Sequence, residues 1–232
     1  MARSIDLGNP FLADLTGVCE ALLVRHGEQA FVPNMVVADG IDAPLSELGE
    51  KQAEAVGERL SAVEIDKVYA SPLQRALRTG EAIASRHDLV PEQRSELEEI
   101  NLFANVPQDV GLLDSIGEDE VRAIYREANR TQRWDAYTYS EDVPAFRARV
   151  VSTIDELLAA HEGQRIVIAC HGGVIATYLA HVFRSTIDRV CTIHHTSIST
   201  IRGSGDRRAV VQVNDFEHVR PLQTELNPMN AS

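Results

Sequence analysis

One heptapeptide near the start of the chain, LLVRHGE over residues 22–28, constrains the fold more than any other stretch. Three apolar residues run directly into Arg25 and His26, and a glycine and a carboxylate follow. An exposed strand would alternate polar and apolar residues, and an amphipathic helix would space its apolar residues three and four positions apart. The stretch therefore predicts a buried strand that ends in a cation and an imidazole.

Two further apolar runs end in the same manner. DKVYAS ends at Ser71, with Arg75 one helical turn later, and RIVIACH ends at His171, with Gly172 and Gly173 next. The carboxyl ends of parallel strands meet at one edge of a sheet, where reactive groups gather. We therefore expect the groups at the ends of these three strands to converge.

Helical patterns lie between the strands. Ser46 predicts an N-cap for a helix over residues 44–62, and Ser71 with Pro72 predicts the start of the next. The remaining predicted elements are helices over residues 71–87, 144–163 and 172–183 and final strands over residues 196–201 and 208–213. The alternation predicts an α/β fold around a mostly parallel sheet, with the weakly patterned residues 101–143 as an insertion.

The chain of 232 residues is long enough for one generous domain, and its composition is that of an ordinary globular protein. We expect this domain over residues 18–220, between loosely ordered tails over residues 1–17 and 221–232. The 22 basic and 35 acidic residues give a net charge of −13. This charge argues against nucleic acid or an anionic membrane as the partner, because both need basic surface.

The cysteines and the hydropathy of the chain indicate the cellular compartment in which the protein acts. Cys19, Cys170 and Cys191 are odd in number and far apart, so they form no disulfide framework or CxxC zinc pattern. No apolar stretch is long enough to span a bilayer, and the N-terminal residues lack the continuous apolar core of a signal peptide. We therefore expect a cytoplasmic protein that acts away from the membrane.

The residues at the three strand ends suit the handling of a phosphoryl group. Arg25 and Arg75 can each offer a planar fork of donors to phosphate oxygens. The amides that follow Gly172 would open a helix, which is a ready anion site. Between them, one neutral imidazole of His26 and His171 can attack phosphorus while the other, protonated, holds the equatorial oxygens.

Each of these features alone has an ordinary structural explanation. Arg75 on a helix would more often belong to a solvated face, and His171 could be a buried histidine with satisfied hydrogen bonds. The conjunction is more specific than its parts, because all three elements occupy the same position in the topology. The pattern as a whole therefore favours a functional site.

Five stretches in this order, LLVRHGE, PLSELGEKQA, VYASPLQRALRTGEAIA, LEEI and VIACHGG, also resemble the histidine phosphatase superfamily. Its members include cofactor-dependent phosphoglycerate mutases and many phosphatases. The resemblance covers roughly residues 20–100 and 145–203. It implies a three-layer α/β sandwich with a helical insertion over the active site, a two-step ping-pong mechanism and no required metal or other cofactor.

Residue by residue, the resemblance assigns roles. His26 resembles the nucleophile that becomes a phosphohistidine, and Arg25, Arg75 and His171 resemble the phosphate pocket. Glu99, the second acid of LEEI, resembles the proton donor.

Two neighbouring acids compete for the donor role. In an extended segment Glu98 and Glu99 would point to opposite faces, so we expect only one of them to reach the pocket. Leu97 would share a side with Glu99, and Ile100 with Glu98, so apolar patterning does not decide between them. The L-x-E spacing of the family chooses Glu99.

The chain also departs from the family pattern. Many members carry an asparagine six residues after the first histidine, whereas this chain has Val32 there and Asn34 two positions later. After the acid, the glycine and GxWEG-like stretch of many members are replaced by NLFANVPQDV. The paired arginines of mutases are not evident in NRTQRWDAY, which favours a phosphatase over a mutase.

Arg122, Arg126 and Arg130 recur every four residues, so on a helix they would lie along one side. We favour the interpretation that they form a solvent-exposed row that pairs with neighbouring glutamates. In the functional alternative they attract an anionic substrate across an otherwise acidic surface.

Three other classes of protein compete with this interpretation. Cys19 and Arg25 have the C-x5-R spacing of cysteine-dependent phosphatases, although the apolar residues between them predict a strand instead of a phosphate loop. A non-catalytic binding module on the same fold would be expected to lack one of the two strand-end histidines. A metal site is disfavoured because two arginines would repel a cation. Its candidate ligands would be His26, Glu28, His171, His194 and His195.

The sequence therefore predicts a phosphomonoesterase for a small phosphate ester, working through a phosphohistidine. A phosphoglycerate mutase-type phosphotransferase is the alternative. The partner is a small molecule, and assembly into a homodimer is left open.

Overall fold

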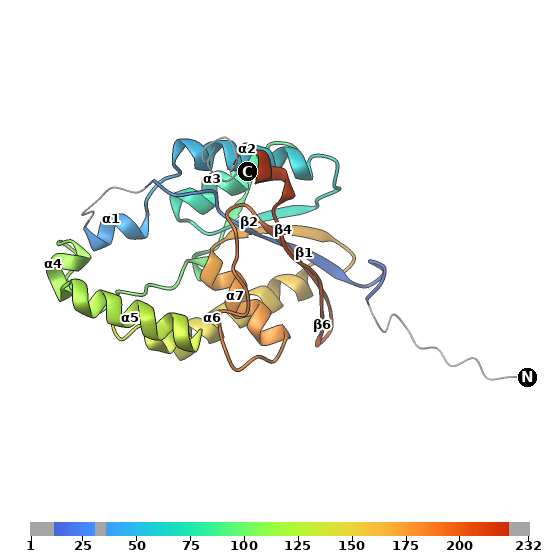
Figure 1. Cartoon of the computed structure of the whole chain (residues 1–232). Helices are drawn as coiled ribbons and strands as arrows, with labels where there is room; N and C mark the ends of the chain where they lie inside the picture. The colour runs from blue at the N-terminus through green and yellow to red at the C-terminus, as the bar shows by residue number, and fades with distance from the viewer. Residues whose placement is uncertain (1–11, 31–35, 223–232) are drawn as a thin grey trace, which may run out of the picture.

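A computed structural model describes residues 12–30 and 36–222, and within them a six-stranded sheet lies between helices (Figure 1). The strands are β1 (Cys19–Arg25), β2 (Lys67–Ala70), β3 (Glu92–Gln93), β4 (Arg165–Cys170), β5 (Ile198–Ser204) and β6 (Arg207–Asp215). Their order is β3-β2-β4-β1-β5-β6, with the first four parallel and the last two antiparallel. The expected mostly parallel α/β fold is confirmed.

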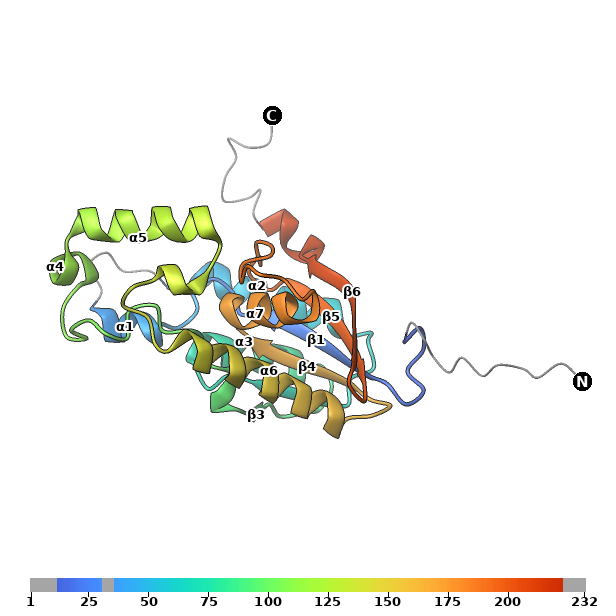
Figure 2. The same ribbon diagram turned by 90° about the horizontal axis from the view of Figure 1, so that it is seen from below.

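Helices cover both faces of the sheet. The layer on one face holds α2 (Glu47–Leu60) and α3 (Gln74–Ala84), and the other holds α6 (Val143–Ala160) and α7 (Gly172–Val182) (Figures 1 and 2). Successive residues of β1 enter different cores, because Leu22 and Val24 pack with the α2 and α3 side chains whereas Leu23 packs with those of α6 and α7. Burial on both faces explains why β1 reads as an unbroken apolar run.

The insertion over residues 101–143 is helical, as predicted. It carries α4 (Leu112–Ile116), α5 (Glu118–Thr131) and the 3₁₀ helix η2 (Trp134–Ala136). With α1 (Val37–Ile41) it lies beyond the carboxyl ends of the parallel strands (Figure 2). The two remaining short elements are the 3₁₀ helices η1 (Ser95–Leu97) and η3 (Glu217–Val219).

One predicted helix start is wrong. α2 begins as expected, since the Ser46 hydroxyl accepts a hydrogen bond from the Gly49 amide at 3.0 Å. α3, however, begins at Gln74 and not at Pro72. Its first amide, that of Gln74, donates to the carboxylate of Asp42 at 2.7 Å. The cap therefore comes from a distant segment, while the Ser71 hydroxyl accepts from the Leu73 amide, one residue before α3, at 3.3 Å.

The two predicted tails lie largely outside the described residues. Leu12, which falls within the segment expected to be loose, is only 2% exposed. The carbonyls of Leu12 and Ala13 accept hydrogen bonds from Arg202 of β5 at 2.8 and 2.9 Å. The division into a domain over residues 18–220 and two tails stays a proposal. Across residues 12–30 and 36–222, no helix is long and apolar enough to cross a membrane.

Candidate active site

The three predicted strand ends meet at one edge of the sheet. β4 lies between β1 and β2 and pairs with both. The residue after β1 and the residue after β2 each add one more backbone hydrogen bond to β4. The amide of His26 donates to the carbonyl of Cys170 at 2.9 Å, and that of Ser71 donates to Ala169 at 3.0 Å. His171 follows β4 directly, so the sheet itself places all three groups side by side.

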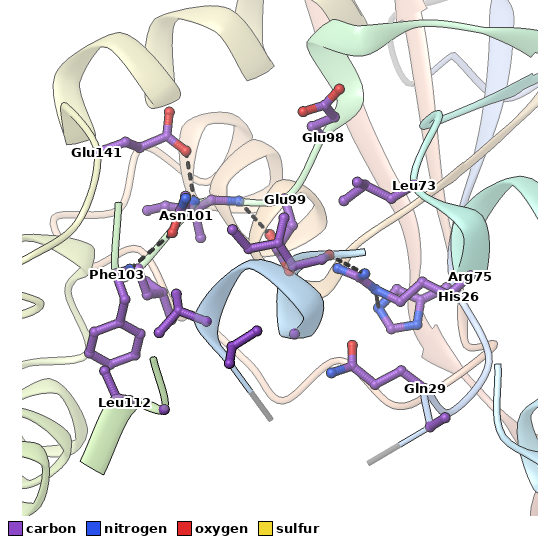
Figure 3. Close-up of a pocket in the computed structure, with 18 of the residues that line it drawn as sticks. His26, Gln29, Leu73, Arg75, Glu98, Glu99, Asn101, Phe103, Leu112 and Glu141 are labelled. Atoms are coloured by element: carbon purple, nitrogen blue, oxygen red, sulfur yellow. Dashed lines mark hydrogen bonds between the residues drawn. The ribbon is translucent and has the colours of Figure 1, made fainter. Parts of the chain in front are cut away.

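His26 is held in a single tautomer. Its ring is buried, and Nδ1 lies 2.6 Å from the carbonyl oxygen of Gly27. Because a carbonyl can only accept, Nδ1 carries the proton and Nε2 carries the lone pair. Arg75 Nε donates to that Nε2 at 3.2 Å (Figure 3). Burial, reinforced by His171 and the arginines Arg75 and Arg25, lowers the pKa of His26 well below its usual value.

Two glycines allow this geometry. A side chain at Gly27 would overlap the Gly49 carbonyl, and one at Gly49 would overlap the carbonyl of Glu28. The loop after β1 is therefore pressed against the start of α2. The amide of Gly27 also donates to the Thr79 hydroxyl of α3 at 3.1 Å. Helices on one face of the sheet thus fix the backbone that holds His26.

Both arginines are fixed by backbone carbonyls. Arg75 is 4% exposed, and its Nη1 donates to the carbonyl of Ile41 at 2.6 Å. Arg25 Nη1 donates to the carbonyl of Ile193, also at 2.6 Å. Arg25 Nε is buried and has no hydrogen-bond partner among the described residues. Each guanidinium therefore keeps donors for an anion beside His26.

His171 completes the pocket. Its ring centroid lies 5.1 Å from that of His26, and its Nε2 lies 2.9 Å from the Ser71 hydroxyl. Its Nδ1 is buried and, within the described part of the chain, has no hydrogen-bond partner. Burial, then Arg75 and Arg25, lowers the pKa of His171 well below its usual value. Both shifts favour the neutral imidazole, and a protonated His171 that donates to a phosphate oxygen stays a prediction.

The sequence predicted Ser71 as a helix cap and as one of the converging strand ends, but it did not predict the contact of Ser71 with His171. In the structure the Ser71 hydroxyl lies 2.9 Å from Nε2 of His171 and also accepts a hydrogen bond from the Leu73 amide at 3.3 Å.

Glu99 sits at the start of α7. Its Oε2 accepts from the Gly173 amide and its Oε1 from the Ile100 amide, each at 3.0 Å. A side chain at Gly173 would overlap this carboxylate. The anion site predicted after Gly172 therefore holds the protein's own acid. Burial raises the pKa of Glu99, although the Gly173 and Ile100 amides and both arginines oppose the rise.

The site opens into a cavity of about 820 Å³. Arg25, His26 and Arg75 line it together with Glu98 and Glu99, and the assignment of the acid role to Glu99 stays a prediction. The segment after η1 is not a regular strand, and strict alternation does not apply. Of these two acids, Glu99 is the one whose charge acts to raise the pKa of both Arg25 and Arg75, against the effect of burial.

A second cavity of about 410 Å³ lies against the same groups. Arg25, Glu99 and Gly172 line it, together with Arg189 and Cys191. A side chain added at Gly172 would be in ordinary contact with the Arg25 guanidinium, and the role of Gly172 in phosphate binding stays a prediction.

A family model of the histidine phosphatase superfamily (branch 1) matches residues 21–216. The chain belongs to the histidine phosphatase superfamily. The match spans β1 to β6 and includes every residue of the site.

The relatives of the chain carry both mutase-like and phosphatase names. The chain is 28% identical to phosphoglycerate mutase-like protein 4 of Arabidopsis thaliana, over 86% of each chain. It is 30% identical to a metal-independent phosphoserine phosphatase of the same plant, over 70% of this chain and 68% of the relative. A mycobacterial glucosyl-3-phosphoglycerate phosphatase shares the fold, with a TM-score of 0.69 at 22% identity over 86% of this chain and all of the other.

The superfamily site is bordered by one of two adjacent histidines. The His195 ring lies 5.8 Å from that of His26, and burial, with Arg25 and His194, lowers the pKa of His195 to about 4. His194 stacks on Phe216 at 4.1 Å and supports the loop before β5. The sequence could not separate these two roles.

The competing chemistries fit less well than that of a histidine phosphatase. Cys19 begins β1 and Arg25 ends it, so they cannot share a phosphate loop. Burial also raises the pKa of Cys19 to about 12. Within residues 12–30 and 36–222, no cluster of three His, Cys, Asp or Glu side chains could hold a metal. Val32 and Asn34 lie outside the described residues.

The arginine stripe of α5 lies away from the site. Arg122 pairs with Glu118, and Arg130 pairs with Glu127 at 2.6 Å. Arg122, Arg126 and Arg130 are exposed, and they are not among the residues that line either cavity. This arrangement fits a solvated helix face.

Proposed function

We propose that the chain is a phosphomonoesterase that hydrolyses a small phosphate ester through a phosphohistidine on His26. The observation that carries the proposal is the fixed tautomer of His26. Gly27 holds the Nδ1 proton, and Nε2 carries its lone pair in a pocket of buried cations. A neutral nucleophile held in place among donors can attack once Arg75 Nε moves its hydrogen bond from Nε2 to a phosphoryl oxygen.

In the first step, Nε2 of His26 bonds to phosphorus as the bond to the ester oxygen breaks. Arg25, Arg75, His171 and the backbone at Gly172 bind the phosphoryl oxygens. The charge of a phosphate dianion opposes the effect of the arginines and favours a protonated, donating His171.

Glu99 gives its proton to the departing alkoxide, so the alcohol leaves neutral. Water then attacks phosphorus and returns a proton to Glu99. Cleavage of the nitrogen–phosphorus bond releases phosphate and restores neutral His26.

The charged residues around the space for the departing alcohol support a phosphatase over a mutase. A mutase must hold a second anionic group of its substrate. Among the described residues that line the main cavity, the cation beyond Arg25 and Arg75 is Arg149, which is already bound to Glu141 and to the Glu98 carbonyl. Retention of both histidines disfavours a non-catalytic binding module. We also propose a cytoplasmic location, because all three cysteines are free.

Phosphate release from p-nitrophenyl phosphate in EDTA tests the proposal. Wild-type protein should turn over, and His26→Ala should lose at least about 10⁴-fold. His181→Ala is the matched control, since His181 is exposed at the end of α7, and it should keep wild-type activity. Equal activity of His26→Ala and wild type would refute the proposal. Isomerisation of 3-phosphoglycerate that outpaces phosphate release would instead establish a mutase.

A further inference from the structure

The main cavity has two chemically different ends. His26 and Arg75 lie at one, and Phe103 and Leu112 lie at the other (Figure 3). The apolar lining comes from α1 and its preceding residue, the segment after Glu99, α4 and α5. Its members are Val36, Val37, Ile41, Leu102, Phe103, Leu112, Leu113 and Tyr125. Large apolar side chains therefore surround the space that the alcohol part of an ester would occupy.

Two of these side chains are unusually exposed. Leu113 is 49% and Tyr125 is 43% exposed, and both line the cavity. A bound apolar group would remove this surface from water, which is favourable roughly in proportion to the area covered. Large apolar side chains beside a set of placed polar groups are typical of sites that bind small molecules with an apolar part.

Charge at this end acts against an anionic leaving group. Glu98 and Glu141 both line the cavity. The nearby cation, Arg149, donates to the Glu98 carbonyl at 3.0 Å and lies 3.5 Å from the Glu141 carboxylate. A carboxylate or second phosphate on the alcohol would face these acids without a free cation among the described lining residues.

We propose that the cavity selects phosphate monoesters of apolar alcohols without negative charge, such as alkyl or aryl phosphates. This inference rests on the proposed phosphatase function and names its substrate class. Specificity comes from α1, α4 and α5, whereas the strand ends supply the chemistry. A volume of about 820 Å³ accommodates a chain of several carbons beside the phosphoryl group.

A series of ethyl, butyl and hexyl phosphate tests the proposal, because the three alcohols have nearly equal basicity. The value of kcat/KM should rise about 2–4-fold for each added methylene. A hexyl phosphate with a terminal carboxylate should react at least about tenfold more slowly than hexyl phosphate itself. A flat series, or equal rates for the last two esters, would overturn the proposal.

Substitutions in the apolar lining test whether these side chains cause the preference for longer alkyl chains. Leu113→Ser and Tyr125→Ser should each lower the ratio of kcat/KM for hexyl over ethyl phosphate, by about 3–10-fold. Val211→Ser is the matched control, since Val211 is 51% exposed on β6 and is not among the cavity-lining residues. Its ratio should match that of wild type.

If both Leu113→Ser and Tyr125→Ser keep the wild-type ratio of kcat/KM for hexyl over ethyl phosphate, the proposal that these side chains bind the alcohol is contradicted. If either variant fails to fold, the other variant and the wild-type series still decide. Absence of phosphate release from every ester would refute the phosphatase function instead.

Discussion

At the scale of single residues, the proposed nucleophile His26 and the proposed acid Glu99 differ in their hydrogen-bond partners. Gly27 fixes the proton of His26 on Nδ1, and the amides of Gly173 and Ile100 hold Glu99. Burial acts on the two groups in opposite directions, because it disfavours charge on both. His26 is thereby kept neutral and nucleophilic, and Glu99 is favoured in its protonated form.

The acid role of Glu99 predicts a loss that depends on the leaving group. Glu99→Gln should lower kcat/KM on ethyl phosphate by about 10²–10⁴-fold. The loss on p-nitrophenyl phosphate should be far smaller, because nitrophenolate leaves without a proton. Glu98→Gln should keep the wild-type ratio of the two rates. Equal losses on both substrates in Glu99→Gln, or a changed ratio in Glu98→Gln, would contradict the assignment.

The two pKa shifts also predict how the activity on alkyl phosphates depends on pH. The pKa of His26 is below its usual 6.5, so the nucleophile stays neutral into more acidic solution. The pKa of Glu99 is above its usual 4.5, so the acid keeps its proton to higher pH. Activity should fall on the acid side as His26 binds a proton and on the alkaline side as Glu99 loses one.

The pH dependence of kcat/KM for ethyl phosphate measures both limbs. Glu99→Gln should abolish the alkaline limb and keep the acid limb. An alkaline limb that persists unchanged in this variant would show that another group titrates there.

At the scale of secondary structure, Glu20 ties β1 to its neighbours on both sides. Its carboxylate accepts from Arg165 of β4 at 2.6 Å and from Arg202 of β5 at 2.7 Å. Burial would raise the pKa of Glu20, but the hydrogen bonds from the two arginines outweigh it and lower the pKa below its usual 4.5. Stability from this group is therefore present above pH 4.5 and is lost as the pH falls through the folded-state pKa.

Glu20→Gln should lower the free energy of unfolding at pH 7 by about 1–3 kcal/mol. The difference from wild type should shrink in acid, where the native carboxyl is itself protonated. Urea unfolding at pH 7 and at about pH 3 measures both values. An equal difference at the two pH values would mean that the charge of Glu20 does not stabilise the sheet.

The arginine stripe of α5 should be dispensable for binding. Neutralising Arg126 and Arg130 together, as Arg126→Gln and Arg130→Gln, should leave KM for a multiply charged phosphate within about twofold, because exposed ion pairs contribute little. Steady-state kinetics at low ionic strength gives the most sensitive readout. A marked rise in KM would favour electrostatic attraction of substrate by this helix.

Local patterns explain which parts of the fold the sequence predicts. The apolar runs that end in His26 and His171 predict their strands and convergence, because burial on both faces leaves a continuous apolar signature. Contacts between distant segments leave no such signature. The Asp42 cap of α3, the Ser71 contact with His171 and the approach of Glu99 to Gly173 all depend on tertiary packing.

At the scale of the whole molecule, the faces of the sheet stabilise the fold, and one edge of the sheet carries the reactive groups. Two apolar cores, one on each face, hold the strands, and the reactive groups lie beyond their carboxyl ends. The insertion and α1 then add the wall that a leaving group would meet. The chain carries a net charge of −13, so the buried arginines form a local cationic pocket in an acidic protein.

The central claim is that His26 carries the phosphoryl group between the two steps. Wild-type protein mixed with phosphate-labelled ethyl phosphate and quenched rapidly should hold a covalent adduct that is labile in acid and survives base, as phosphoramidates do. His26→Ala should hold none, and His181→Ala should match wild type. An alkali-labile adduct, or one that persists in His26→Ala, would contradict the mechanism.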